Sequence, residues 1–338
     1  MITVTLYSRA DCHLCEQVHQ DLLALQSEIP HKLVVIDVDS NPDFQRAYGL
    51  DVPVVEVGPY KLRAPFEKQE LRITLMAAHD RKEQLDSIGG PEYQRLVQQG
   101  QSWTKADGFA YWLSNHYLAI FNLFVLVYLG LPILAPALMK VGWQTPAALI
   151  YRVYGTMCHQ WAFRTFFLFG EQPDYPRAAA GVKGVLTFSQ ATGLGEGSTA
   201  NELIAAREFI GNEKVGYKMA LCERDIAIWG GILLFGLIYA ISGRRLPALP
   251  WYLWLLIGIL PIGIDGLTQL LSQPPLSFYP FRESTPFLRS LTGGLFGVTT
   301  AWFGYPMTEL TMAETRRIMA AKLLRLKGSV LTHKPATG

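Results

Sequence analysis

The sequence predicts an α/β domain at the N-terminus followed by an all-α membrane domain. Residues 1–85 contain 9 Lys/Arg and 13 Asp/Glu among short apolar runs, a composition typical of a water-soluble domain. From residue 117 onward, long stretches carry no charge at all. At 338 residues the chain has room for two or three domains. Basic residues do not cluster with aromatic ones outside the apolar region, so we expect no nucleic-acid partner.

The most informative motif is Cys12-His13-Leu14-Cys15. It follows the alternating run at residues 2–7 and opens a helical apolar pattern that extends to Leu25. The N-terminus of a helix carries partial positive charge, which favours the thiolate of the first cysteine, and the second cysteine is placed to resolve a mixed disulfide. The alternative is half of a zinc site, but no second Cys/His pair follows within the next hundred residues.

The rest of the first 85 residues alternates strands and helices. Residues 31–38 form a β-branched run typical of a buried strand, and a short helix follows from Asn41-Pro42 to about Tyr48. Strands at 51–57 and 60–63 and an amphipathic helix from about Phe66 to Arg81 complete the order β-α-β-α-β-β-α. A helix between two strands predicts a right-handed parallel crossover.

This order, the Cys-x-x-Cys motif and the Val52-Pro53 step resemble the thioredoxin fold, specifically the small glutaredoxin-like proteins. The segments that carry the resemblance are 7–15 and 48–53, and it covers about residues 1–82. The resemblance implies that Cys12 attacks, that Cys15 resolves, and that a cis Pro53 shapes the groove for a partner's backbone. Glutathione-binding members carry Gly-Gly-x-Asp after the last strand, whereas this chain has Leu62 to Glu67 there, so glutathione is not implied as the reductant.

Residues 86–115 read as a linker and interfacial segment. Gly89-Gly90-Pro91 opens it, and Trp103, Tyr111 and Trp112 suit a membrane–water interface. Within the Cys-x-x-Cys motif, His13 either supports the Cys12 thiolate as an imidazolium or is an exposed helix residue.

The membrane domain is expected at 116–310. A spanning helix needs about 20 mostly apolar residues. Four segments meet this length, at 117–139, 226–243, 250–271 and 289–308. Residues 147–169 are apolar but carry Arg152, His159, Gln160 and Arg164, which predicts an amphipathic or re-entrant helix rather than a lipid-exposed span. An insert at 171–221 separates it from the next span.

Polar residues at the ends of these spans are predicted to converge. Because consecutive spans are antiparallel, the start of one, the end of the next and the start of the third lie at the same membrane face. Ionisable residues at membrane depth are costly unless paired, and they indicate a functional site by default; the alternative is a salt-bridge network that fixes helix packing. The residues concerned are Cys222, Arg224, Asp225, Asp265, Gln269, Glu283 and Arg289.

The membrane half resembles a family of prokaryotic membrane proteins of unassigned function, over about residues 150–300. Four segments carry this resemblance: Cys158-His159-Gln160 with Arg164, and the segments at 221–224, 263–269 and 283–293. In that family the two cysteine motifs lie close in sequence, whereas about 50 residues separate them here. The resemblance implies no reaction.

Charge bias predicts the orientation in the membrane. The tail at 311–338 carries six Lys/Arg and one acidic residue, and Arg244-Arg245 fill a short loop, so the positive-inside rule places both in the cytosol. No basic region followed by an apolar run opens the chain, so we expect a cytosolic N-terminal domain on a multi-pass cell-membrane protein. A cytosolic N-terminal domain and a cytosolic C-terminal tail are consistent with each other if residues 147–169 do not cross the membrane. The polar residues at the span ends then lie at the outer face.

Two functions fit these observations, and a third, non-enzymatic interpretation is a scaffold in which the N-terminal domain has lost its chemistry. The first is a membrane-anchored thiol–disulfide oxidoreductase, whose partner is a thiol/disulfide protein or a small thiol, with Cys158 and Cys222 as a second redox pair. The second is a membrane-embedded enzyme or transporter centred on the polar residues, with the N-terminal domain as its redox regulator. In this second case Cys158, His159, Cys222 and Asp225 are zinc ligands by type, and zinc is the only cofactor that the sequence suggests.

Overall fold

The computed structural model describes residues 1–195 and 199–327. The chain divides into two compact units. Unit 1 comprises Met1–His116 together with the chain from Leu310 onward, and unit 2 comprises Tyr117–Glu309. The described residues after Leu310 belong to the last helix of the chain, α12 (Pro286–Lys327), so a C-terminal helical segment forms part of the N-terminal unit.

Unit 1 is built on a four-stranded mixed sheet with the order β2-β1-β3-β4. The strands are β1 (Ile2–Ser8), β2 (His31–Asp37), β3 (Val54–Val57) and β4 (Tyr60–Arg63). The first two pair in parallel, and the other neighbours pair antiparallel. The α/β class and the strand–helix order expected from the sequence are confirmed.

The two faces of this sheet carry separate cores because side chains alternate along each strand. On one face, α1 (His13–Leu25) and α3 (Lys68–Ile88) bury Leu22 and Leu75 against Val4. On the other face, the core contains Tyr7, Phe44 of α2 (Pro42–Tyr48), and Ala320 and Ala321 of α12. Residues 311–327 of the expected basic tail are helical, and Ala320 and Ala321 are buried in this core. Residues 328–338 of the tail lie outside the described part.

The expected linker at 86–115 is also more ordered than its composition suggests. It contains the end of α3, α4 (Pro91–Gly100) and the first turns of α5 (Lys105–Lys140). Tyr111 packs against the core that holds Ala320, so it is not simply an interfacial aromatic. Lys322 donates to Asp107 at 2.8 Å and to the carbonyl of Gln99 at 2.9 Å, which ties this segment to α12.

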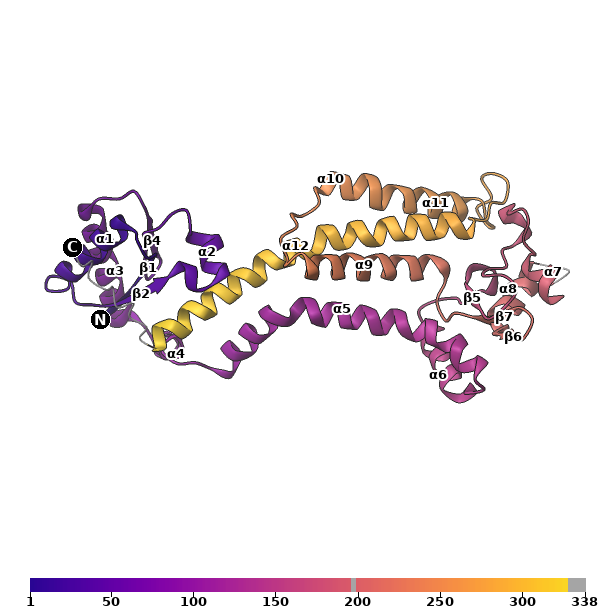
Figure 1. Ribbon diagram of the computed structural model, residues 1–338, viewed down its shortest axis with the longest axis horizontal. Helices are drawn as coiled ribbons and strands as arrows, with labels where there is room; N and C mark the ends of the chain where they lie inside the picture. The colour runs from indigo at the N-terminus through magenta and orange to yellow at the C-terminus, as the bar shows by residue number, and fades with distance from the viewer. Residues whose placement is uncertain (196–198, 328–338) are drawn as a thin grey trace. The chain divides into compact units, whose positions relative to one another are not determined.

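Unit 2 is mostly helical. Its long helices are α5, α9 (Glu223–Ile241), α11 (Leu260–Leu271) and α12; the short α10 (Trp251–Leu253) and a π-helical stretch, Trp254–Ile259, lead into α11. In Figure 1, α9, α11 and α12 run side by side. A Cβ at Gly297 of α12 would overlap the backbone of Ile228 in α9, so glycine permits this close approach.

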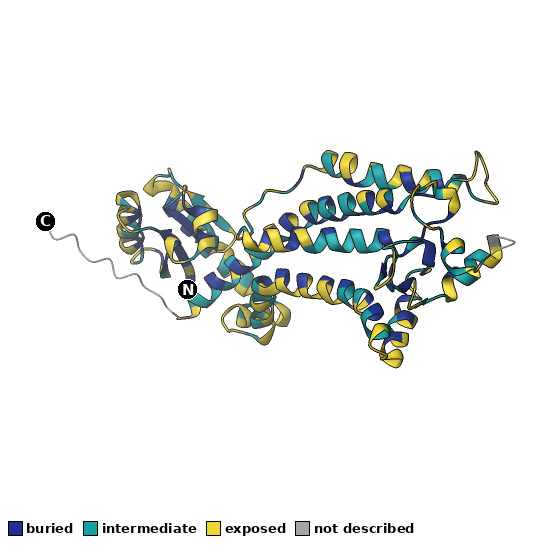
Figure 2. Cartoon of the chain, turned by 45° about the vertical axis from the view of Figure 1, so that its right-hand side comes forward, coloured by how far each residue is buried: buried dark blue, intermediate teal, exposed yellow. Residues whose placement is uncertain are grey.

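Three helices in the described residues are long and apolar enough to cross a membrane: Lys105–Lys140, Glu223–Ile241 and Trp251–Leu271. Many residues along the long helices are exposed (Figure 2). They include large apolar side chains, which is the pattern expected of lipid contact. Examples are Phe121, Phe124, Leu234, Ile238, Leu256 and Ile264. The fourth expected span, 289–308, is helical within α12 but is not among these three helices, and it stays a prediction.

The helix expected over 147–169 is wrong in its length. The observed helix α6 is Gln144–Tyr154 and ends at Gly155. Gln160 then adopts a positive φ of 54°, which no helix contains, and the chain continues as a 3₁₀ turn, Ala162–Arg164. The following insert holds a small sheet of β5 (Phe167–Leu168), β7 (Gly216–Lys218) and β6 (Gly211–Asn212), with α7 (Phe188–Thr192) and α8 (Thr199–Glu208).

Candidate functional site

The cysteine pair of unit 1 lies where β1 leads into α1. Cys12 is the N-cap of α1, and its Sγ accepts the backbone N–H of Cys15 at 3.3 Å. Cys12 and Cys15 are joined as a disulfide, with their Cα atoms 5.2 Å apart. Cys15 is fully buried, whereas Cys12 is half-exposed and His13 is exposed. An accessible first sulfur with a shielded second one is the arrangement that thiol–disulfide exchange requires.

A groove is lined by Leu14 of the Cys-x-x-Cys motif and by Pro53. The Val52–Pro53 peptide bond is cis, as the resemblance implied. Pro53 lines a cavity of about 340 Å³ together with Leu14 of the Cys-x-x-Cys motif, Phe66 and Leu71. Asp21 and Lys68, which form an ion pair at 3.0 Å, also line it. The cavity therefore combines apolar and charged side chains with Leu14 of the Cys-x-x-Cys motif.

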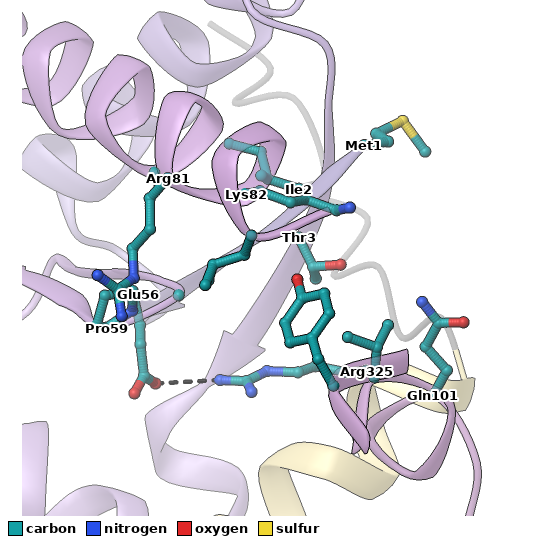
Figure 3. A pocket seen from close by; sticks show the side chains of 14 residues that line it. Met1, Ile2, Thr3, Glu56, Pro59, Arg81, Lys82, Gln101 and Arg325 are labelled. Carbon is teal, nitrogen blue, oxygen red and sulfur yellow. Dashed lines mark hydrogen bonds and ion pairs between the residues drawn. The ribbon is translucent and has the colours of Figure 1, made fainter. Parts of the chain in front are cut away.

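A second cavity in unit 1, of about 360 Å³, is shown in Figure 3. Arg325 of α12 reaches into it and pairs with Glu56 of β3 at 3.1 Å. Met1 and Ile2 line this cavity, so it lies at the start of β1, whereas Cys12 follows the end of the same strand. This cavity is therefore separate from the cysteine pair.

The predicted polar residues of unit 2 that the structure brings together fall into three groups. Glu283 is the centre of the first group and is almost fully buried. Arg164 donates to both of its carboxylate oxygens, at 2.8 and 2.9 Å, and Gln269 donates at 2.8 Å. Arg289 also donates to Glu283, and Arg177 lies 3.6 Å away. Burial would raise the pKa of Glu283, but the hydrogen bonds and charges of these arginines hold it below its usual value.

Asp265 is the centre of the second group. Arg224 donates to one of its oxygens, Arg282 donates to the other at 2.7 Å, and Ser284 donates to both. These residues come from the start of α9, the end of α11 and the segment before α12. The antiparallel order of the spans predicts that these residues meet at one end of the bundle, and the structure pairs Arg224 with Asp265, and Gln269 and Arg289 with Glu283.

A third group contains both remaining cysteines. Ligand atoms of Cys158, Cys222 and Asp225 all lie within 4.8 Å of one another. The Cys222 Sγ donates to Asp225 Oδ2 at 3.2 Å. The neighbouring Cys222 thiol lowers the pKa of the Cys158 thiol to about 7, and the interaction with Cys158 together with burial raises the pKa of Cys222. His159 does not join them, because its exposed ring stacks on Trp161 at 4.6 Å.

Gln160 holds this third group in place. Its buried Nε2 donates to the carbonyls of Tyr151 at 3.0 Å and Ala220 at 2.9 Å. The backbone carbonyl of Gln160 accepts a hydrogen bond from Lys218 Nζ at 2.7 Å. Gln160 therefore connects the loop of Cys158 to the segment that precedes Cys222. Within the Cys-His-Gln motif, Gln160 therefore has a structural role.

Sequence reasoning missed Lys218, which is buried although lysine is usually exposed. Its ammonium donates to the carbonyls of Gln160, Ala206 and Arg207, and burial lowers its pKa to about 7. The sequence also gave no sign of Arg177, which pairs with Glu202 at 2.5 Å as well as with Glu283. The sequence feature that could indicate a buried Lys218 is its place in the strand Gly216–Lys218. Side chains alternate along a strand, so Lys218 lies on the same, buried face as Gly216.

The two units thus define a thioredoxin-like domain joined to a helical domain of membrane type. Residues 3–79 match the family model described as a glutaredoxin-like domain (DUF836). Residues 208–303 match the model described as a predicted membrane protein (DUF2085). The chain therefore combines a glutaredoxin-like domain with a domain of this predicted membrane protein family. The second match begins after Cys158 and Arg164, so it is shorter than the resemblance at 150–300.

Two further similarities were found. The uncharacterized protein MJ1492 of Methanocaldococcus jannaschii is 26% identical over 204 residues, which make up 58% of this chain and 94% of that protein. The X-ray structure of the structural genomics target protein XcR50 from X. campestris is 37% identical; the match covers 22% of this chain and 96% of that one, with a TM-score of 0.19.

Proposed function

We propose that the protein is a membrane-anchored thiol–disulfide oxidoreductase. The observation that carries the proposal is the asymmetry of the cysteine pair: Cys12 is half-exposed at the N-terminus of α1, and Cys15 is buried behind it. The N–H of Cys15 and the positive end of the helix both stabilise negative charge on the Cys12 sulfur. The glutaredoxin-like family match supports the same chemistry.

In the reductive direction, the Cys12 thiolate attacks one sulfur of a partner disulfide. The partner's S–S bond breaks, a mixed disulfide with Cys12 forms, and the partner's other sulfur leaves as a thiolate. Cys15 then loses its proton and attacks Cys12, which releases the partner's second sulfur. The partner gains two electrons and two protons, and the Cys12–Cys15 disulfide must be reduced again by a dithiol protein or a small thiol.

The groove beside Pro53 is where the partner's backbone would lie. Leu14, Phe66 and Leu71 provide apolar contact, and the Asp21–Lys68 pair provides polar contact at the edge. This lining suits an extended peptide that carries a cysteine. It supports a protein partner over glutathione, because the segment Leu62–Glu67 lacks the glycine pair of glutathione-binding relatives.

Insulin reduction by the purified full-length protein tests this function. Cys12→Ser should abolish activity, and Cys15→Ser should stop at a mixed disulfide that non-reducing electrophoresis detects. The double variant Cys158→Ser, Cys222→Ser is the matched control and should keep full activity. Unchanged activity in Cys12→Ser would refute the proposal and leave unit 1 as a scaffold beside the polar groups of unit 2.

We further propose that unit 1 lies in the cytosol and that the chain crosses the membrane an even number of times. Within unit 1, Arg316 pairs with Asp43 at 2.8 and 3.2 Å, and Ala320 and Ala321 share a core with Phe44. Residues before the first span and after the last one must therefore lie on the same side. Four spans satisfy this requirement, and α6 with the insert then lies at the outer face.

This topology keeps the two cysteine pairs apart. The polar groups and Cys222 lie at the start of α9, and four spans would place that end at the face opposite unit 1. Direct exchange between the two pairs is therefore not part of the proposed function. Single cysteines placed along residues 140–225 in a cysteine-free background test the topology, since a membrane-impermeant reagent should label them from outside. Labelling only after the cells are opened would refute it.

A further inference from the structure

We propose that Cys158, Cys222 and Asp225 bind a thiophilic divalent cation, with Zn²⁺ as the expected metal. Two thiol sulfurs and a carboxylate oxygen meet within 4.8 Å, and they come from separate parts of the fold. Cys158 lies in the loop after α6, whereas Cys222 and Asp225 lie at the start of α9. The site is distinct from the cysteine pair of unit 1 and does not depend on the oxidoreductase function.

The spacing of the three ligand atoms fits tetrahedral coordination. Bonds of about 2.3 Å to sulfur and about 2.1 Å to oxygen place neighbouring ligands of a tetrahedral Zn²⁺ about 3.6–3.8 Å apart. Cys222 Sγ and Asp225 Oδ2 are 3.2 Å apart, and the full trio stays within 4.8 Å. Small side-chain adjustments would therefore bring all three to bonding distance. Three protein ligands leave a fourth position open for water or a substrate.

The protein holds the site together from outside the ligand set. Gln160 joins the carbonyl of Tyr151 to that of Ala220, so the loop of Cys158 and the segment before Cys222 are braced against each other. Tyr151 itself donates to the carbonyl of Lys218 at 2.5 Å. Partners of this kind, which orient ligands without touching the metal, are typical of metal sites.

Charge also favours a cation over a disulfide. A carboxylate beside two sulfurs contributes nothing to a disulfide, but it is a natural third ligand for Zn²⁺. When the cation binds, both thiols release their protons, and two thiolates with one carboxylate leave a net charge of about −1 on the complex. The positive end of α9 and the Gln160 N–H, 3.5 Å from Cys158 Sγ, lie beside that charge.

The test uses full-length protein in detergent with Cys12→Ser and Cys15→Ser, so that only the second cysteine pair can bind metal. The protein is reduced, stripped of metal and titrated anaerobically with Co²⁺, whose thiolate bonds give a charge-transfer absorption. We expect about one equivalent bound, with tetrahedral cobalt bands that Zn²⁺ displaces. Less than about a tenth of an equivalent, or binding without thiolate bands, would overturn the proposal.

Variants assign the ligands. Cys158→Ser and Cys222→Ser should each remove the charge-transfer band, and Asp225→Asn should weaken Co²⁺ binding at least about tenfold. His159→Ala is the matched control, because His159 is adjacent in sequence but stacks on Trp161. It should bind Co²⁺ as the parent does. Loss of binding in His159→Ala, or unchanged binding in Asp225→Asn, would overturn the assignment of these three ligands.

Discussion

The ion pair between Arg316 and Asp43 should stabilise unit 1 strongly, although Arg316 lies near the C-terminus. Arg316 donates to both oxygens of Asp43, at 2.8 and 3.2 Å, and to the carbonyl of Ser114 at 2.7 Å. The side chains of Arg316 and Asp43 are only 8% and 11% exposed. Replacement of Arg316 by alanine would leave the Asp43 carboxylate buried without this partner.

The size of the effect follows from these contacts. Removing one member of a buried pair costs about 3–5 kcal/mol, and the lost bond to Ser114 adds about 1 kcal/mol. Because the pair retains some solvent contact, we expect Arg316→Ala to lower the free energy of unfolding of unit 1 by about 3 kcal/mol. The coupling energy between Arg316→Ala and Asp43→Ala should be about 1–2 kcal/mol. The exposed Arg9–Asp39 pair has the same bidentate chemistry and should show little coupling.

Hydrogen exchange of the full-length protein in detergent measures this effect. Peptides from α2 should exchange about a hundredfold faster in Arg316→Ala, since each 1.4 kcal/mol is about a factor of ten. The double-mutant cycle with Asp43→Ala separates the pair from other contacts of Arg316. The reasoning would be refuted if the double-mutant cycles gave equal coupling energies for Arg316–Asp43 and Arg9–Asp39. It would also be refuted if α2 kept its protection from hydrogen exchange in Arg316→Ala.

Three further predictions concern unit 2. Glu283→Gln should lower the stability in detergent by about 3–5 kcal/mol, seen as a lower thermal midpoint, because Arg164 and Arg289 lose their shared carboxylate. Burial lowers the pKa of Lys218 to about 7 in the folded protein, so between pH 7 and 10 the unfolded state binds more protons than the folded state. The free energy of unfolding should therefore rise over this pH range. Lys218→Met should flatten the rise, as measured by thermal melting at a series of pH values. Gly297→Leu should disrupt the contact of α12 with Ile228 and give aggregated protein on size-exclusion chromatography, whereas Gly304→Leu, where a Cβ meets no neighbour, should not.

The fold of unit 1 could be predicted because residues close together in the sequence determine its strands, helices and turns. Alternating apolar residues in β1 and β2 set the two faces of the sheet, and the break at Gly58-Pro59 separates β3 from β4. The convergence of Asp265 and Glu283 could also be predicted, because antiparallel order alone fixes which span ends meet. Both inferences needed only the sequence order of the elements.

What could not be predicted depends on contacts between distant segments. The composition of residues 311–338 predicts a basic cytosolic tail and does not show that part of it packs on the N-terminal domain. Ala320 and Ala321 share a core with Phe44, and Arg316 pairs with Asp43. Periodicity also suggested one helix over 147–169. A helical pattern does not show that the Gln160 side chain will bond to the carbonyls of Tyr151 and Ala220, which requires the chain to turn after Gly155.

The two cysteine pairs suit different chemistry because of how the chain holds them. Cys12 and Cys15 belong to one helix start, so the bond between their sulfurs can open and close while the backbone keeps its 5.2 Å Cα separation. Cys158 and Cys222 are held by two segments that Gln160 connects, with Asp225 beside the sulfurs. A disulfide there would leave Asp225 without its thiol donor, whereas a cation would satisfy all three groups at once. The carboxylate is therefore the feature that separates metal binding from exchange, and Asp225→Asn is the variant that decides between them.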